Sequence, residues 1–353
     1  MDQFVCVRMP QVNNIDLTRF QFDYDLTLAI FFMNADGTVY GRFGTRTSVD
    51  DATDDISLEG LAESMAAVLK LHEGYPNNKK YLDGKQAKPS DYKRPNDFPQ
   101  LRGKYKDNID YDSSKVVQSC LHCHQIRDAH RAVYRSASKP IPDRILYPYP
   151  MPDVLGLHLD PKHRAKVAKV DRGSWAAKAE LEPGDEILTL EGQAIVSTAD
   201  VQWVLHHAPD QGQLDALLSR GVDVVHTTLT LPKDWRHASK IDWRVTSWSL
   251  RRMGTGGMKV EAASNEVRRR AKLQDGQMAL LVKHTGKYGQ HAVAHRAGVK
   301  VNDVVVAFDG RTDLMNDSQL LAYSAKNTKP NQLVSVVVMR GSQRLEFKLK
   351  MQQ

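Results

Sequence analysis

The chain has 353 residues, of which 41% are hydrophobic and 26% charged, and a formal net charge of +7, which is typical of a globular protein of about two to three domains. The longest apolar-rich run, Leu26 to Met33, is far shorter than the roughly 20 residues of a membrane helix, so membrane insertion is not expected. The basic excess lies in one segment, because residues 75–150 contain 15 Lys and Arg against 8 Asp. No nucleic-acid-binding motif accompanies these charges, and we expect an irregular solvated collar and no nucleic-acid partner.

The N-terminal region, residues 1–74, predicts a small mixture of strands and helices. Residues 4–9 and 26–33 have the apolar content of strands, and the glycine-containing stretch 34–37 is typical of a hairpin turn. Apolar residues recur at helical spacing over residues 57–74, after a serine that is suited to cap the helix. We therefore expect a strand, a short helix within residues 13–24, a hairpin and a closing helix in this order.

This order of elements resembles the second half of a thioredoxin fold. The resemblance covers residues 1–74 and implies either a thiol oxidoreductase or a scaffold. The CxxC of that family would lie before residue 1, and its cis-proline, expected near Thr27, is missing. Because thiol exchange needs a thiolate and a resolving partner, we expect an incomplete thioredoxin-like scaffold in which Cys6 is a small buried hydrophobic residue. An oxidoreductase whose catalytic cysteines lie upstream of residue 1 stays open as an alternative.

A basic linker and a short cysteine motif form the next region, residues 75–150. Residues 75–112 contain Pro, Gly, Asn and Asp throughout, which predicts a linker or a wrapping loop. The stretch SCLHCHQI at 119–126 then holds two of the three cysteines of the chain. The residues after it can continue a helix until several prolines end it before residue 153.

The CxxCH motif predicts covalently attached haem c. Two thioethers anchor the porphyrin from one side of a helical turn, and the adjacent histidine becomes the proximal iron ligand. Cys120, Cys123 and His124 meet this requirement. The alternatives are a zinc or other metal site completed by His122 or His130, a dithiol or disulfide, and no site at all. The zinc alternative lacks the second cysteine pair of a four-ligand site.

The other face of the iron needs its own ligand. Class I cytochromes, which this segment resembles, place a methionine in a proline-bearing loop after the CxxCH helix, and Met151 lies between two prolines. Its resemblance to that methionine makes Met151 our candidate for the second iron ligand. His158, His163 and a five-coordinate iron are alternatives, and Met151 in a purely packing role is the plainest interpretation.

Haem attachment through CxxCH implies export, because the thioether bonds form outside the cytoplasm in bacteria. The start of the sequence has no basic and apolar leader of the secretory kind. We therefore expect a periplasmic or exported protein whose N-terminus is incomplete here, and a cytoplasmic protein is the alternative.

The C-terminal part contains an internal repeat. Residues 179–193 (AELEPGDEILTLEGQ) align without gaps with residues 297–311 (AGVKVNDVVVAFDGR), so that Asp185 matches Asp303. Each copy is followed by a helix and a closing strand, and GLHL at 156–159 parallels GMKV at 257–260. We call residues 151–232 the first repeat and residues 233–353, including a Trp- and Arg-rich lead-in, the second repeat.

Both repeats resemble PDZ domains of the bacterial, protease-associated type, most closely in RGSWAAKAELEPGDEILTLEGQ. The resemblance implies that extended peptides or protein C-termini pair with a strand beside a helix. The residues that it assigns to peptide binding are Leu155, Gly156, Leu157, Leu159, Val201 and Leu205 in the first repeat and Gly257, Met258 and Val260 in the second. Segments of the chain itself are alternative occupants of these sites, and the Trp-rich lead-in is expected to be buried.

These observations predict an α+β multidomain protein with a thioredoxin-like half-domain, an irregular to helical CxxCH segment and two PDZ β-sandwich or barrel domains. The whole arrangement resembles thioredoxin-like/PDZ proteins of the planctomycete type. We expect a periplasmic haem-c adaptor, an electron carrier or redox sensor, that binds peptides and a redox partner protein. The alternative is a PDZ scaffold in which CxxCH is a metal or disulfide staple. Serine hydrolase, P-loop and zincin motifs are absent, so catalysis is not the favoured interpretation.

Overall fold

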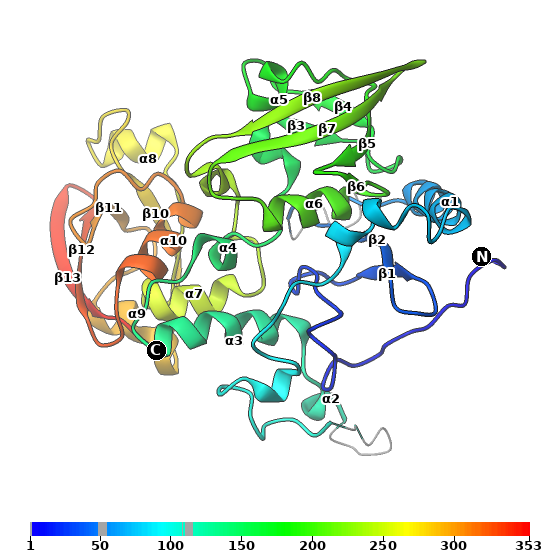
Figure 1. Ribbon diagram of the computed structural model, residues 1–353. Coiled ribbons are helices and arrows are strands. Elements are labelled where there is room, and N and C mark those ends of the chain that lie inside the picture. Colours follow the sequence, from blue (N-terminus) through cyan, green and yellow to red (C-terminus); the bar gives the residue numbers. More distant parts are fainter. Residues whose placement is uncertain (1, 49–54, 108, 110–115) are drawn as a thin grey trace. The chain divides into compact units, whose positions relative to one another are not determined.

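The computed structural model has a mixed α/β fold with several small sheets (Figure 1). The residues that it describes are 2–48, 55–107, 109 and 116–353. The chain divides into two compact units. The first unit consists of Met1–Ala129 and Tyr147–Ser239, and the second of His130–Leu146 and Lys240–Gln353. In the described part of the chain, no helix has the length and apolar character that crossing a lipid bilayer requires.

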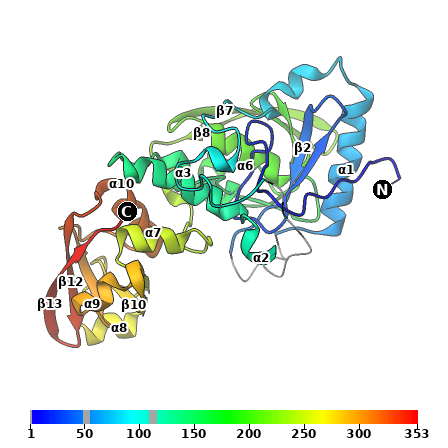
Figure 2. The same ribbon diagram turned by 90° about the horizontal axis from the view of Figure 1, so that it is seen from below.

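A short hairpin and one helix organise the N-terminal region of the first unit. Strand β1 (Ile30–Met33) pairs antiparallel with β2 (Val39–Phe43), and helix α1 (Leu58–Glu73) begins after Ser57, whose side chain accepts a hydrogen bond from the N–H of Gly60. Figure 2 shows α1 alongside β2. The predicted hairpin and closing helix are therefore confirmed.

The strand predicted for residues 4–9 is wrong, and so is the short helix predicted within residues 13–24, which form turns. Residues 4–9 have no regular structure, and Val5 and Val7 are 94% and 83% exposed. Cys6 is exposed as well and is not the buried residue that we expected. A strand needs a neighbour to satisfy its backbone N–H and C=O groups. Among the described residues, the sheet of β1 and β2 has only these two strands, and residues 4–9 pair with neither of them.

The N-terminal region shares its apolar core with the first repeat. Phe32, Tyr40 and Phe43 of the hairpin pack together with Val196 of the first repeat. Gly41 of β2 makes this approach possible, because a Cβ atom on it would lie 2.2 Å from Cγ2 of Val196. The hairpin therefore packs directly on the first repeat as part of one unit.

The segment between the N-terminal region and the first repeat is irregular, as predicted, with short helical turns. Its elements are η1 (Lys79–Tyr81), η2 (Asp83–Lys85), η3 (Pro95–Asp97), α2 (Val116–Ser119), α3 (Cys123–Ser136) and α4 (Asp143–Leu146). Part of the predicted basic linker, residues 108 and 110–115, lies outside the described residues. Helix α3 contributes its residues up to Ala129 to the first unit and those from His130 onward to the second.

The first repeat combines small sheets with one principal helix. Its elements are η4 (Pro152–Leu155), β3 (Leu157–Leu159), β4 (Val167–Val170), α5 (Trp175–Lys178), β5 (Glu186–Leu190), β6 (Gln193–Ala194), α6 (Thr198–His207), β7 (Gly212–Arg220) and β8 (Asp223–Leu231). The next element, η5 (Trp235–Ala238), lies in the lead-in of the second repeat but belongs to the first unit. Strands β3 and β4 form one sheet, and the order β6-β5-β7-β8 forms another. Apolar side chains of β3, α6 and β7 meet in a single core, which holds the helix against the strands.

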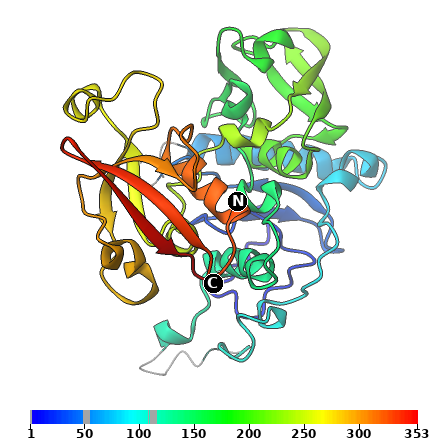
Figure 3. The same ribbon diagram turned by 90° about the vertical axis from the view of Figure 1, so that its left-hand side faces the viewer.

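The second repeat builds one five-stranded antiparallel sheet of order β13-β12-β11-β10-β9. Its elements are α7 (Ser247–Gly254), β9 (Met258–Ala262), α8 (Asn265–Arg270), β10 (Leu280–Thr285), η6 (Gly289–Ala292), α9 (Val293–Ala297), β11 (Val304–Phe308), α10 (Asp317–Asn327), β12 (Leu333–Arg340) and β13 (Gln343–Lys350). The long β12–β13 hairpin appears in red in Figure 3. The core lies under this sheet and includes Val260, Leu320 and Val336.

The two aspartates matched by the sequence repeat occupy the same structural position. Asp185 is 1% exposed and accepts two hydrogen bonds from Arg220 at 2.7 and 2.8 Å. Asp303 is also 1% exposed and accepts two from Arg340 at the same distances. Each arginine also donates to a backbone carbonyl, at Glu180 in the first repeat and at Gly298 in the second. The internal repeat is therefore a repeat of structure as well as of sequence.

Candidate functional site

The CxxCH motif lies where a loop enters helix α3. Helix α2 ends at Ser119, and α3 begins at Cys123. The Nδ2 group of Asn13 donates to the carbonyl of Ser119 at 2.9 Å, and Oδ1 of Asn13 accepts from the N–H of Leu121 at 2.7 Å. Leu121 is buried. The loop is therefore fixed by an asparagine that is distant in sequence, and the motif has a defined backbone.

The two thiols of the motif are partly buried, and neither forms a disulfide. The thiol of Cys120 donates to the carbonyl of Val116 at 3.3 Å. Burial raises the pKa of the Cys123 thiol, because a thiolate loses hydration there. His124 is half-buried in the first turn of α3, and its ring stacks on that of His122 with the centroids 5.6 Å apart. Both sulfurs and the adjacent imidazole thus belong to one loop-to-helix junction.

The residues present fit covalent haem better than tetrahedral zinc. Haem c requires two reduced thiols at the start of a helix and an imidazole in its first turn, which Cys120, Cys123 and His124 supply. Structural zinc requires four ligands. Besides the two cysteines, the described residues of this junction offer the stacked pair His122 and His124, and stacked rings do not aim their nitrogens at one point.

Met151, the candidate for the second iron ligand, has surroundings of its own. It immediately precedes η4, and its sulfur accepts a hydrogen bond from the Thr45 hydroxyl at 3.1 Å. Within the described residues, no hydrogen bond or ring contact joins Met151 to the CxxCH motif. The alternatives are also engaged elsewhere, since His158 lies 2.8 Å from Asp171 and His163 lies 2.8 Å from Glu63.

Strand β3 is the second candidate site, because one of its edges has no strand partner. It pairs with β4 alone, so that among the described strands the two form a sheet of their own. The loop before it ends at Gly156, which has φ +75° and whose Cβ would lie 2.2 Å from Cβ of Ser174. This glycine is therefore required for the turn into β3. An open strand edge presents backbone N–H and C=O groups to an extended chain.

The side chains that were predicted to line this site are deeply buried. Leu155, Leu157, Val201 and Leu205 are each 1–2% exposed and belong to one apolar cluster, against which Leu159 packs from a partly buried position. The structure thus brings the predicted residues together, but as the core that holds β3 against α6. The part of this site that can contact a ligand is therefore the backbone edge of β3.

The outer face of α6 is held by a buried charge network. The carboxylate of Asp200 lies 2.6 Å from Nζ of Lys85 and accepts from the N–H of Arg42 at 3.1 Å, and all three residues are buried. The guanidinium of Arg42 lies 3.5 Å from the ring centre of Trp203, whose indole N–H donates to Gly84 at 2.9 Å. Burial lowers the pKa of Arg42 to about 10 and also lowers the pKa of Lys85. The N-terminal region and the linker segment therefore together fix α6 on this face.

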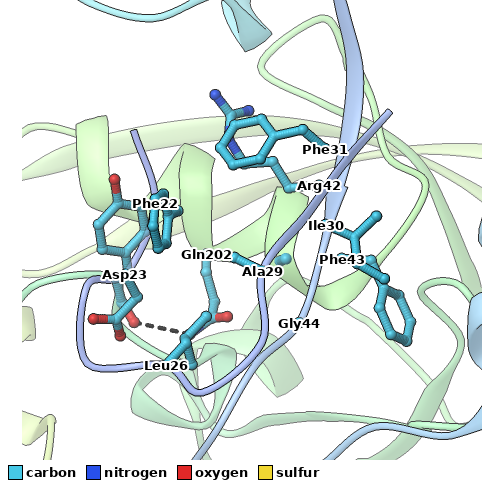
Figure 4. Close-up of a pocket in the computed structure, with 12 residues that line it drawn as sticks. Phe22, Asp23, Leu26, Ala29, Ile30, Phe31, Arg42, Phe43, Gly44 and Gln202 are labelled. Atoms are coloured by element: carbon cyan, nitrogen blue, oxygen red, sulfur yellow. Dashed lines mark hydrogen bonds between the residues drawn. The ribbon is translucent and has the colours of Figure 1, made fainter. Parts of the chain in front are cut away.

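Figure 4 shows a small cavity between the β1–β2 hairpin and α6. Its lining includes Phe22, Phe31, Arg42, Tyr149 and Gln202, and Gln202 donates to the carbonyl of Tyr149 at 2.9 Å. The cavity has a volume of about 20 Å³. That is room for a single water molecule and not for a substrate, so we do not regard this cavity as a ligand site.

The predicted site of the second repeat is covered. Gly257 has φ +86° and precedes β9, where Met258 and Val260 are 0% and 1% exposed. Strand β9 is an edge of its sheet and pairs with β10 alone among the described strands. Asp317, at the start of α10, faces it closely enough for the N–H of Val260 to lower the pKa of this carboxyl. The edge strand is therefore present, but a side chain of the chain itself faces it.

Sequence reasoning missed the charged residues behind both helices. Asp200 meets partners from positions 42 and 85, and Asp317 pairs with Arg251. Nothing in the local pattern distinguishes these residues from the solvated charges of an ordinary helix. A buried pair becomes visible only when the fold brings distant segments together.

One family model and several solved structures are similar to parts of this chain. A family model described as PDZ domain matches residues 153–231. Among solved structures, a variant of the HtrA-type protease AlgW with a tripeptide has 23% identity and TM-score 0.23 and covers 27% of this chain and 30% of its own. The same protease with a decapeptide has 17% identity and TM-score 0.25 and covers 40% and 48%. The match thus spans less than half of either of these chains.

No match was found among curated proteins. The edge strand β3, the glycine turn before it, the facing helix α6 and the family match all fall in the first repeat. The chain contains a PDZ domain at residues 153–231.

Proposed function

We propose that this protein binds extended peptides or protein C-termini by strand addition to β3 of its PDZ domain. The observation that carries the proposal is the unpaired edge of β3 within a segment matched by a PDZ family model. In PDZ domains the ligand becomes an additional strand, so its backbone supplies affinity and pockets for alternate side chains supply specificity. In this domain the core residues under β3 are closed, so we expect the backbone of the peptide to dominate binding.

The buried network around Asp200 supports this function through rigidity. Arg42 of the N-terminal region and Lys85 of the linker segment hold α6. A helix that is fixed before the ligand arrives lowers the entropy lost on binding. The N-terminal region would then serve as a scaffold for the peptide site, whether or not it derives from a thioredoxin fold.

The test is a selection from a display library of random decapeptides with free C-termini. A selected peptide is then compared with two chemical analogues, one with a C-terminal amide and one with N-methyl groups at alternate backbone positions. N-methylation removes strand pairing and leaves the side chains intact, so we expect at least a tenfold loss of affinity. Hydrogen exchange should show protection at 157–159. Full affinity of the N-methylated peptide would exclude strand addition.

We further propose haem c at the CxxCH motif as a second function, which would make the protein an exported electron carrier or redox sensor and would require a redox partner protein. The observation that favours it is the start of α3 at Cys123, with reduced, partly exposed thiols and an adjacent imidazole. Cys120 and Cys123 would hold the porphyrin by thioether bonds and His124 would hold the iron, which supplies one-electron chemistry when bound.

Expression in a host competent in cytochrome maturation tests this proposal. Covalent haem would remain on the chain after denaturing electrophoresis, and the Cys120→Ala and Cys123→Ala variants would each weaken it. Cys6→Ala is the matched control and should change nothing. A colourless product that contains zinc would favour the metal-staple alternative. A colourless product without metal would leave the PDZ domain as the working part.

A further inference from the structure

We propose that the second repeat holds a latent peptide site along β9, specific for an extended peptide with an arginine or lysine, and that Arg251 occupies the cation position of this site in the free protein. The inference rests on the proposed strand-addition function and extends it to the second repeat. It assigns a ligand class to this repeat and a role to α7.

Asp317 lies beside the open edge of β9. This carboxylate begins α10, is 4% exposed and faces the N–H of Val260 on the open edge of β9. That approach is not a well-aligned hydrogen bond, since Oδ1 of Asp317 makes none within the described part of the chain. A buried carboxylate oxygen without a donor is costly. Its position beside an edge strand marks a place for a donor supplied by a ligand.

In the free protein, a cation of the chain itself pairs with Asp317. The guanidinium of Arg251, on α7, contacts Oδ2 of Asp317, and both side chains are buried. The ring of Trp248 lies on its other side, 5.1 Å from the guanidinium carbon. A carboxylate and an aromatic face together form a typical guanidinium site. Trp248 is 45% exposed, so one wall of this site is open to solvent.

Helix α7 runs beside the edge of β9. At its C-terminal end Gly254 packs against α10 so closely that a Cβ would lie 2.1 Å from Oγ of Ser324. On its other face, Trp248 meets His284 of β10 edge to face, with the ring centres 5.7 Å apart. Helix α7 thus reaches both α10 and β10, the two neighbours of β9. An incoming strand would have to displace the Arg251 side chain before it could pair with β9.

The first repeat lacks the carboxylate–guanidinium pair that Asp317 and Arg251 form in the second repeat. The helix residue that corresponds to Asp317, counted from the N-caps Ser197 and Asn316, is Thr198. Thr198 carries no charge, and within the described residues it makes no side-chain hydrogen bond or ion pair. The carboxylate and its cation are therefore a specific addition to the second repeat, and they predict a different ligand for it.

The test uses two fluorescent pools of random decapeptides that differ only in a central arginine or its neutral isostere citrulline. The variant Arg251→Gln empties the cation position. We expect it to bind the arginine pool at least tenfold more tightly than the wild type does, with no gain for the citrulline pool. Hydrogen exchange should show new protection at 258–262. The double variant Arg251→Gln/Asp317→Asn should lose the preference for arginine.

Arg340→Gln is the matched control, because it breaks a second arginine–aspartate pair with a buried carboxylate in this repeat, at strands that lie beyond β10 from β9. It should destabilise the protein without any gain in peptide binding. If Arg251→Gln folds poorly, N-acetylarginine amide should raise its melting temperature and leave that of Arg340→Gln unchanged. Equal binding of both pools by Arg251→Gln, or protection at 157–159 alone, would overturn the inference. Failure of binding at β3 with success at β9 would overturn only the proposed function of the first repeat.

Discussion

The two repeats hold their principal helices by the same means and with opposite consequences for the neighbouring strand. In the first repeat, Asp200 of α6 pairs with Lys85 of the linker segment. In the second, Asp317 of α10 pairs with Arg251 of α7 and faces β9. Each helix is anchored by a buried carboxylate and by a cation from an earlier segment of the chain, the linker for α6 and α7 for α10. The anchor of α6 leaves the edge of β3 unpaired, whereas the anchor of α10 covers the edge of β9.

This difference teaches that a repeated fold does not imply a repeated binding site. The paired aspartates Asp185 and Asp303 have nearly identical surroundings, because they serve the fold itself. The residues that differ, Thr198 and Asp317, lie where the helix meets the edge strand. We therefore expect ligand specificity to depend on residues 198 and 317, which differ between the two copies.

The largest expected effect is on the anchor of α6. Asp200→Ala leaves Lys85 and Arg42 as buried cations without a carboxylate, and breaking a buried pair in this way typically costs about 3–5 kcal/mol. Urea unfolding measures the loss. Asp215→Ala, which removes an exposed carboxylate from β7, should cost less than about 0.5 kcal/mol. Equal losses for the two variants would show that the network does not stabilise the unit.

The buried carboxylate of Asp317, which anchors α10, should instead make the unfolding free energy depend on pH. Burial raises the pKa of Asp317 to about 6, aided by the charge of Asp242 and opposed by Arg251 and the N–H of Val260. Because the folded pKa lies above the ordinary value of 3.8, this group contributes stability below pH 3.8 and loses it as the pH rises through about 6. The contribution is on the order of 3 kcal/mol.

The measurement is the unfolding free energy of the wild type minus that of Asp317→Asn, at several values between pH 4 and pH 7. The subtraction removes the titration of other carboxyl groups, which mostly has the opposite sign. The difference should fall as the pH rises through this window. A difference that is flat or that rises would mean that Arg251 keeps the carboxylate ionised throughout.

A smaller effect is expected where the N-terminal hairpin meets the first repeat. Gly41→Ala forces a methyl group against Cγ2 of Val196, and overpacking of this kind costs about 1–3 kcal/mol. Val196→Ala removes the opposing methyl groups. The double variant should therefore be more stable than the sum of the two single losses implies, which a double-mutant cycle in urea detects. Strict additivity of the two stability losses would mean that the hairpin moves away from Val196 at no cost in free energy.

The sequence predicted the parts of this protein whose signals are local. The hairpin turn at Gly37, the cap at Ser57 and the repeat that aligns Asp185 with Asp303 could all be recognised from neighbouring residues. The strand proposed around Cys6 failed because apolar content indicates a strand without supplying a partner for it. The anchors could not be predicted, since Asp200 meets Lys85 across 115 positions and no single window contains both.

The last comparison transfers the proposed ligand class from one repeat to the other. Thr198→Asp places a carboxylate at the start of α6, where Asp317 stands in α10. An acidic residue in the first turn complements the helix dipole, so stability should rise by about 0.3–1 kcal/mol. If the residue at this position selects the ligand, the variant should gain several-fold affinity for the arginine pool over the citrulline pool, with protection at 157–159. Thr198→Asn, a neutral match in size, should show no such preference. If both variants preferred the arginine pool, another position would determine the selectivity. If neither variant did, a carboxylate at this position would be insufficient, and the cation site would need both Asp317 and Trp248.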